Sequence, residues 1–162
     1  MSGDGNPQDE AARVRKKALD LLARREHSCR ELRDKLVRKG FPAPLAGHTV
    51  EALAAEDLIS DTRYAESWLR HRRQKGYGPV RIRQELREKG VDPEIIQRFV
   101  RFDDPRWLAE LGRVREKKFG PAPPAGSEER ARQARFLQYR GFVLEQILKV
   151  LDADTVIDAS IE

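Results

Sequence analysis

Apolar residues recur at intervals of three and four positions along most of the chain, which is the spacing of amphipathic helices. Val14, Ala18, Leu21 and Leu22 are one such set. No stretch has the alternating pattern of a half-buried strand, so the sequence predicts an all-α fold. We expect helices within residues 11–26, 28–40, 43–59, 61–75, 78–90, 92–100, 104–119, 127–142 and 143–151.

Capping residues mark the ends of these helices. Ser28 and Glu31 have the spacing of a capping box, and Gly40 is a typical helix stop. Gly78 and Pro79 similarly open a later helix. Aspartates at three further starts are candidate caps, namely Asp61, Asp92 and Asp104.

The segment SCRELRDKLVRKGF, residues 28–41, has a second version in GPVRIRQELREKGV, residues 78–91. A weaker third version follows in residues 127–142. Each has a helix before it and a helix after it, so the repeating structure is a three-helix repeat. The positions that correspond are Arg33/Arg83, Leu36/Leu86/Leu137, Lys39/Lys89/Arg140 and Gly40/Gly90/Gly141.

A repeat of about fifty residues buries little apolar surface alone, so neighbouring repeats are expected to stack into an elongated, curved, solenoid-like chain. We place the repeats at residues 13–60, 61–103 and 104–151. A disordered leader (1–12) and an acidic, frayed tail (152–162) are expected to flank them. The segment 120–127 is rich in Pro and Gly and predicts an exposed connector inside the third repeat.

The charge of the chain is divided into blocks. Its 162 residues carry a net charge of +5. Residues 13–39 hold 11 basic and 4 acidic side chains and residues 70–101 hold 10 and 4, whereas 40–66 is acidic. Such basic blocks suggest surfaces that face a polyanion or an acidic protein.

The same composition predicts where the protein acts. No apolar run approaches the length of a membrane span, and the first residues do not resemble a signal peptide. We therefore expect a cytoplasmic protein. We also expect it to be a monomer. Cys29 is the single cysteine and predicts neither a disulfide nor a metal site.

We find no catalytic constellation in the sequence. His27, His48 and His71 are scattered and are expected at the surface. Glu56 and Asp57 are interpreted as solvated charges rather than Mg²⁺ ligands, and no phosphate-binding glycine loop is present. The sequence predicts a protein without cofactor, metal or enzymatic activity.

The strongest candidate site is the basic stretch RHRRQKGYGPVRIRQELREK, residues 70–89. A helix dipole favours cations at its C-terminus, but Arg81 lies near a helix N-terminus, which suggests an external partner. Tyr77 could stack on a base or a partner side chain, or pack within its own repeat. The candidate partner-binding residues are Arg70, Arg72, Arg73, Lys75, Tyr77, Arg81, Arg83, Arg87 and Lys89. We expect most of these arginines to project into solvent.

Residues 58–91, with RFLQYRGF at 135–142, resemble the RecX family of bacterial regulators. The matching elements include Asp61, Arg63-Tyr64-Ala65, Lys75-Gly76 and Gly90. The resemblance implies three tandem three-helix repeats. It also implies a non-enzymatic protein that binds RecA and its filament on single-stranded DNA, and modulates ATP hydrolysis, strand exchange and coprotease activity in the SOS response and recombinational repair.

A second hypothesis comes from the same basic helices. Three-helix units also describe helix-turn-helix domains, so the chain could be a self-sufficient DNA-binding regulator. Arg81, Arg83 and Gln84 would then read base edges. Three linked copies fit an extended filament better than a single operator.

Overall fold

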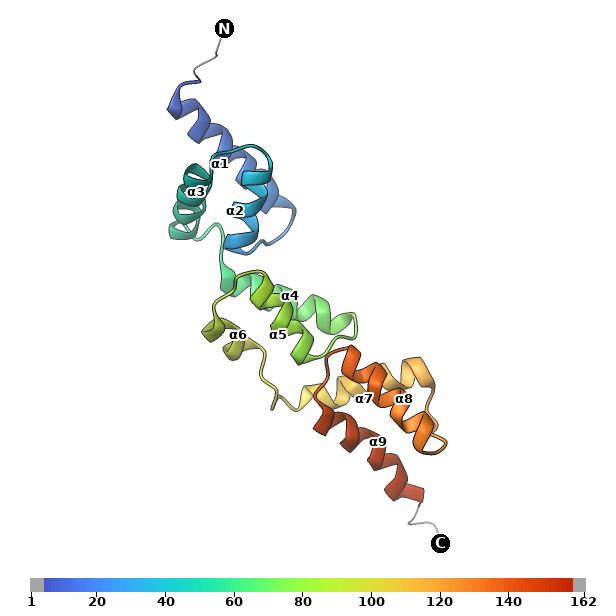
Figure 1. The fold of residues 1–162 in the computed structure, drawn as a ribbon. Coiled ribbons are helices and arrows are strands. Elements are labelled where there is room, and N and C mark those ends of the chain that lie inside the picture. The colour runs from blue at the N-terminus through green and yellow to red at the C-terminus, as the bar shows by residue number, and fades with distance from the viewer. Residues whose placement is uncertain (1–4, 159–162) are drawn as a thin grey trace. The chain divides into compact units, whose positions relative to one another are not determined.

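The computed structural model describes residues 5–158, with side chains as far as Ala153. This part of the chain forms nine helices and no strand, which confirms the all-α prediction (Figure 1). The helices are α1 (Pro7–Arg24), α2 (Cys29–Arg38), α3 (Ala43–Ala55), α4 (Asp61–Gln74), α5 (Pro79–Glu88), α6 (Pro93–Phe99), α7 (Arg106–Phe119), α8 (Ser127–Tyr139) and α9 (Leu144–Asp158).

The chain divides into two compact units. Unit 1 consists of Met1–Ser67 and Leu86–Ile96, and unit 2 consists of Trp68–Glu85 and Gln97–Glu162. Helices α4, α5 and α6 each contribute residues to both units. The boundary therefore passes through the predicted second repeat, and the limits that we placed at 13–60, 61–103 and 104–151 stay a prediction.

Unit 1 has its core between α1, α2 and α3. Val14 and Ala18 of α1 are fully buried, as the apolar spacing of that helix predicts. Phe41 and Leu45 are partly buried and pack against this core. The buried members of the core are Val14, Ala18, Leu21, Leu32, Leu36, Ala46, Val50, Leu53 and Ile59.

Unit 2 buries its apolar side chains where α7 and α8 pack against α9. Trp107 is fully buried and meets Phe142 edge-on, with ring centroids 6.5 Å apart. Phe119 and Phe136 make a second edge-on pair at 5.3 Å. Other buried side chains of this unit include Leu69, Ile82, Val100, Leu111, Leu137, Ile147 and Leu151.

Both terminal helices are longer than predicted. Helix α1 begins at Pro7, inside the segment that we expected to be disordered, because Asn6 caps it by accepting from the backbone N–H of Gln8 at 3.2 Å. Helix α9 continues to Asp158, beyond the predicted end at Leu151. The rest of the predicted leader (1–4) and tail (159–162) lies outside the described residues.

Helix α3 is shorter than predicted and ends at Ala55. Asp57 has a φ of 58°, in the left-handed region, so the chain turns away from the helix there. The backbone N–H of Leu58 then donates to the carbonyl of Leu53 at 2.9 Å. Apolar spacing alone predicts a helix as far as Ile59. It carries no information about the left-handed backbone angle of Asp57, which ends the helix earlier.

The cap at the start of α2 is shared with another helix. Ser28 accepts from the backbone N–H of Glu31 at 3.1 Å, as the capping box predicts. The Glu31 carboxylate instead pairs with Arg25 and Lys35. Asp61 accepts from the backbone N–H of Cys29 at 2.8 Å, so it caps α2 rather than its own helix.

His27 is buried, contrary to the expected surface position. Its Nδ1 lies 3.0 Å from the Arg25 carbonyl and its Nε2 lies 2.9 Å from Lys35 Nζ. An ammonium can only donate, so Nε2 accepts and the ring is neutral. Burial lowers the pKa of His27 below its ordinary value, although the hydrogen bond to the Arg25 carbonyl opposes the shift.

We expect the single thiol of this chain to resist alkylation. Burial, followed by the Asp61 carboxylate, raises the pKa of Cys29 to about 11. At pH 7 the thiolate is then about a hundredfold scarcer than in an unperturbed cysteine. Iodoacetamide modification followed by mass spectrometry should be correspondingly slow, and Asp61→Asn should accelerate it. A rate equal to that of a short cysteine peptide would contradict the shielding.

Candidate functional site

The basic stretch between α4 and α5 lies in unit 2 as far as Glu85 and is organised around Tyr77. Three guanidinium groups lie over its ring, with distances from Cζ to the ring centroid of 3.8 Å for Arg72, 4.4 Å for Arg81 and 5.0 Å for Arg140. Cation–π contacts of this kind stabilise a fold when the guanidinium and the ring are partly desolvated. The tyrosine ring therefore packs against arginines of α4 and α5 and of the turn that follows α8.

One carboxylate ties this cluster together. Glu85 accepts from Arg72 through two hydrogen bonds of 2.9 and 2.7 Å, from the indole N–H of Trp68 at 2.8 Å, and from Arg81 at 3.2 Å. A two-pronged arginine–carboxylate pair is directional and among the stronger protein hydrogen bonds. Arg72 therefore stabilises the junction, and Arg81 shares the same acceptor.

The turn between α4 and α5 rests on the turn between α8 and α9. Gly78 donates its backbone N–H to the carbonyl of Arg140 at 2.8 Å, and Val80 donates to the carbonyl of Gly141 at 2.9 Å. In return, the Arg140 guanidinium donates to the carbonyl of Lys75 at 3.1 Å. The two turns approach so closely that neither Gly78 nor Gly141 has room for a Cβ atom.

Unit 1 contains the corresponding contact. Ser28, which opens α2, donates its hydroxyl to the carbonyl of Lys89 at 2.8 Å. A Cβ atom on Gly90 would collide with the side chain of Arg30. The matched positions Lys89/Arg140 and Gly90/Gly141 thus have a structural function in both units: a carbonyl that accepts, followed by a glycine that permits close approach.

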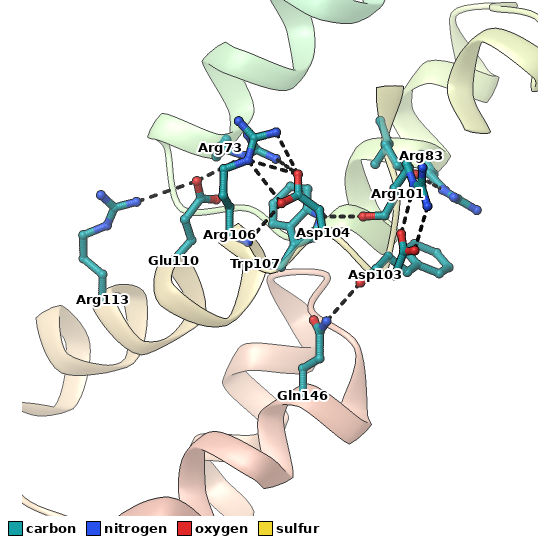
Figure 2. A network of polar contacts seen from close by, with 12 residues as sticks. Arg73, Arg83, Arg101, Asp103, Asp104, Arg106, Trp107, Glu110, Arg113 and Gln146 are labelled. Carbon is teal, nitrogen blue, oxygen red and sulfur yellow. Dashed lines mark hydrogen bonds and ion pairs between the residues drawn. The ribbon is translucent and has the colours of Figure 1, made fainter. Parts of the chain in front are cut away.

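We expected Arg73 to project into solvent, but its side chain is largely buried. Figure 2 shows its guanidinium between the carboxylates of Asp104 and Glu110, at 3.7 and 3.2 Å. It also lies over the Trp107 ring, 4.3 Å from the centroid, and only 15% of its side chain is exposed. Burial raises the pKa of Glu110 although Arg73 opposes the shift. Arg73 is therefore a structural link between α4 and α7.

Arg83 holds the segment that joins α6 to α7. It donates to the carbonyl of Val100 at 2.7 Å and lies 3.9 Å from the centroid of Phe102. Trp107 donates to the carbonyl of Arg101 at 2.8 Å, and Gln146 of α9 donates to the carbonyl of Phe102 at 3.0 Å (Figure 2). The segment is thus anchored from α5, α7 and α9.

The remaining candidates lie nearer the surface. Arg70, Lys75 and Arg87 are exposed, Lys89 is half-buried, and 33% of the Arg81 side chain is accessible. In the part of the chain that the structure describes, no carboxylate is paired with Arg70 or Lys75. Of the eight basic candidates, these two are therefore the best placed to contact an anionic partner.

Sequence reasoning missed Tyr139 as a candidate. Its side chain is 75% exposed at the end of α8, and Arg81 lies beside it, 5.4 Å from the ring centroid. The corresponding residues of the other repeats are Arg38 and Glu88, both charged. An aromatic side chain at a position that is otherwise charged was the signal that could have identified it.

Within residues 5–158, no three His, Cys, Asp or Glu side chains are grouped so that they could hold a metal ion. No helix in the same range combines the length and the apolar character that crossing a membrane requires.

Comparison with known proteins identifies the family. The chain matches the models of the first, second and third three-helix domains of RecX at residues 15–53, 60–98 and 108–151. It is 43% identical over 150 residues to the regulatory protein RecX of Pseudomonas entomophila, covering 93% of this chain and 97% of that one.

Two further matches agree. Regulatory protein RecX of Halorhodospira halophila is 47% identical over 134 residues, which is 83% of each chain. The crystal structure of RecX from Lactobacillus salivarius has the same fold, with a TM-score of 0.78 at 21% identity, over 92% of this chain and 99% of that one. With all three of its helical repeats matched, the chain belongs to the RecX family of regulatory proteins.

Proposed function

We propose that this protein binds RecA and its filament on single-stranded DNA, and that it restrains ATP hydrolysis, strand exchange and coprotease activity without catalysing a reaction itself. Membership of a family of regulatory proteins supports a regulatory role. The resemblance to RecX supports RecA as the partner, and we further propose that the protein acts in the cytoplasm as a monomer. The sequence contains no catalytic constellation that would suggest a competing activity.

The observation that carries the proposal is the exposed positive charge at the end of α4. Arg70 and Lys75 remain accessible although neighbouring arginines are paired with carboxylates or carbonyls. Binding to a partner of opposite charge would cost these two side chains little desolvation, since they are already at the surface. A nucleoprotein filament offers phosphates and acidic side chains together.

The alternative, a helix-turn-helix regulator that reads DNA sequence with α5, is less well supported. Sequence readout needs side chains directed at base edges. Arg81 shares the Glu85 carboxylate, and Arg83 donates to the carbonyl of Val100 while it lies over Phe102. Two of the three proposed reading residues therefore have intramolecular functions.

We expect the protein, titrated into the cognate RecA on single-stranded DNA, to lower the rate of ATP hydrolysis. The double variant Arg70→Glu, Lys75→Glu should need about tenfold more protein for half-inhibition, which corresponds to about 1.4 kcal/mol. The matched control is Lys117→Glu, Lys149→Glu, which changes the net charge equally at other exposed sites of unit 2.

The comparison of these two variants decides the role of the site. If both lose inhibition equally, net charge alone acts and the two candidate residues have no special role. If the unaltered protein has no effect on RecA at any concentration, the proposed function is wrong. Where Arg70 and Lys75 contact phosphates, their loss should also flatten the dependence of log K on log salt, by about 0.7 for each contact.

A further inference from the structure

We propose that unit 2 carries a docking surface for a protein segment that offers apolar side chains flanked by carboxylates. The Tyr139 surface consists of Val80, Tyr139 and Leu144, whose side chains are 45%, 75% and 46% exposed. The inference rests on the proposed function. It adds that the three apolar side chains of this surface contact the protein of the filament rather than its DNA.

The backbones of the three residues are brought near one another because two turns meet. Val80 donates its backbone N–H to the carbonyl of Gly141 at 2.9 Å. Tyr139 ends α8 and Leu144 begins α9, so they flank that glycine on either side. Among residues 5–153, seven large hydrophobic residues are exposed, and three of them lie at this contact or within three residues of it in sequence. Isolated apolar residues are ordinary on a protein surface, but a grouped set indicates an interaction site.

The rim of the Tyr139 surface is basic. Arg81 reaches the carbonyl of Tyr139 at 3.5 Å and keeps a third of its side chain exposed. Arg140 precedes Gly141, and its guanidinium donates to the carbonyl of Lys75, which brings a further exposed cation close by. The acidic residue in the cluster, Glu85, already accepts from Arg72, Trp68 and Arg81. A partner with carboxylates around its apolar side chains is complementary to this rim.

The composition favours a protein over single-stranded DNA. DNA-binding grooves combine aromatic platforms with cations that follow successive phosphates. Here two of the three exposed side chains are aliphatic and offer no stacking face to a base. Tyrosine and arginine around a small apolar centre is the composition of an energetically dominant protein–protein contact.

The test compares Tyr139→Ala and Val80→Ser with Val37→Ser, a matched control because Val37 is also a helical valine and is 41% exposed in unit 1. Binding of each protein is measured to RecA filaments by cosedimentation and to an oligothymidylate by fluorescence anisotropy. Helix content by circular dichroism verifies that each variant is folded.

We expect Tyr139→Ala to weaken filament binding by about tenfold or more and oligothymidylate binding by less than about twofold. Val80→Ser should also weaken filament binding more than oligothymidylate binding. Val37→Ser should change neither. Equal losses for filament and oligothymidylate would make Tyr139 a base-stacking residue and overturn the inference. Unchanged filament binding by both variants would overturn it while leaving the proposed function intact. Failure of the unaltered protein to bind filaments would remove both.

Discussion

Trp107→Ala is expected to lower the free energy of unfolding of unit 2 by about 3 to 5 kcal/mol. The indole is fully buried, so its removal leaves a large cavity. The carbonyl of Arg101 also loses the indole N–H that donates to it at 2.8 Å, and the Arg73 guanidinium loses the ring over which it lies. The loss of this hydrogen bond adds to the cost of the cavity.

Urea denaturation followed by circular dichroism measures this loss. Trp107→Phe is the informative companion, because it keeps most of the apolar volume but removes the N–H donor, and it should cost less than the alanine variant. The second tryptophan of the chain, Trp68, remains as a fluorescent reporter in both. A loss below about 1 kcal/mol for Trp107→Ala would show that Arg73, Asp104 and Glu110 hold α4 to α7 without the indole.

Gly78→Ala should be nearly as damaging, although it adds a single methyl group. A Cβ atom there would lie 2.5 Å from the carbonyl carbon and oxygen of Gly141 and 2.6 Å from the backbone nitrogen of Phe142. Backbone atoms cannot rotate away as a flexible side chain can, so the two turns must separate. Separation also weakens the hydrogen bonds that join Gly78 to Arg140 and Val80 to Gly141. We expect a cost of about 3 kcal/mol or more.

Gly112→Ala is the matched control and should have the opposite sign. Gly112 lies within α7, where a Cβ atom would meet nothing within 4 Å. Alanine in a helix interior is favoured over glycine by about 0.5 to 1 kcal/mol. Measured together by urea denaturation, the two substitutions separate a general preference for alanine from the close approach of the turns. Equal effects on stability would mean that the contact at Gly78 is soft.

The helices were predictable because their signals are local. Ser28, Pro79 and Gly90 mark helix ends within a few residues of where the structure places them. Errors arose where one backbone angle decided the outcome, as at Asp57, or where a cap lay outside the apolar pattern, as at Asn6. The three-helix repeat was likewise visible, because the same punctuation returns at a constant spacing.

The functions of the arginines were not predictable, because their partners lie far away in sequence. Arg73 is ion-paired with Asp104 and Glu110, and Arg83 donates to the carbonyl of Val100. A basic run identifies where positive charge is concentrated along the chain. It does not distinguish a guanidinium that folds back onto a carboxylate from one that remains available, such as that of Arg70. That distinction is made by tertiary structure.

The turn-to-turn contact has a consequence for where the chain can change length. The short links before α2 and α5 each fit against a glycine turn, so an added residue in either link would displace the groups that meet there. The longer link between α7 and α8 meets no such turn within residues 5–158, and much of it is solvent-exposed. A hydrogen bond of 2.7 Å from Arg115 to the carbonyl of Ala122 anchors its first half. Residues 123–126 are therefore the place at which a fluorescent tag or epitope could be inserted with the least disturbance.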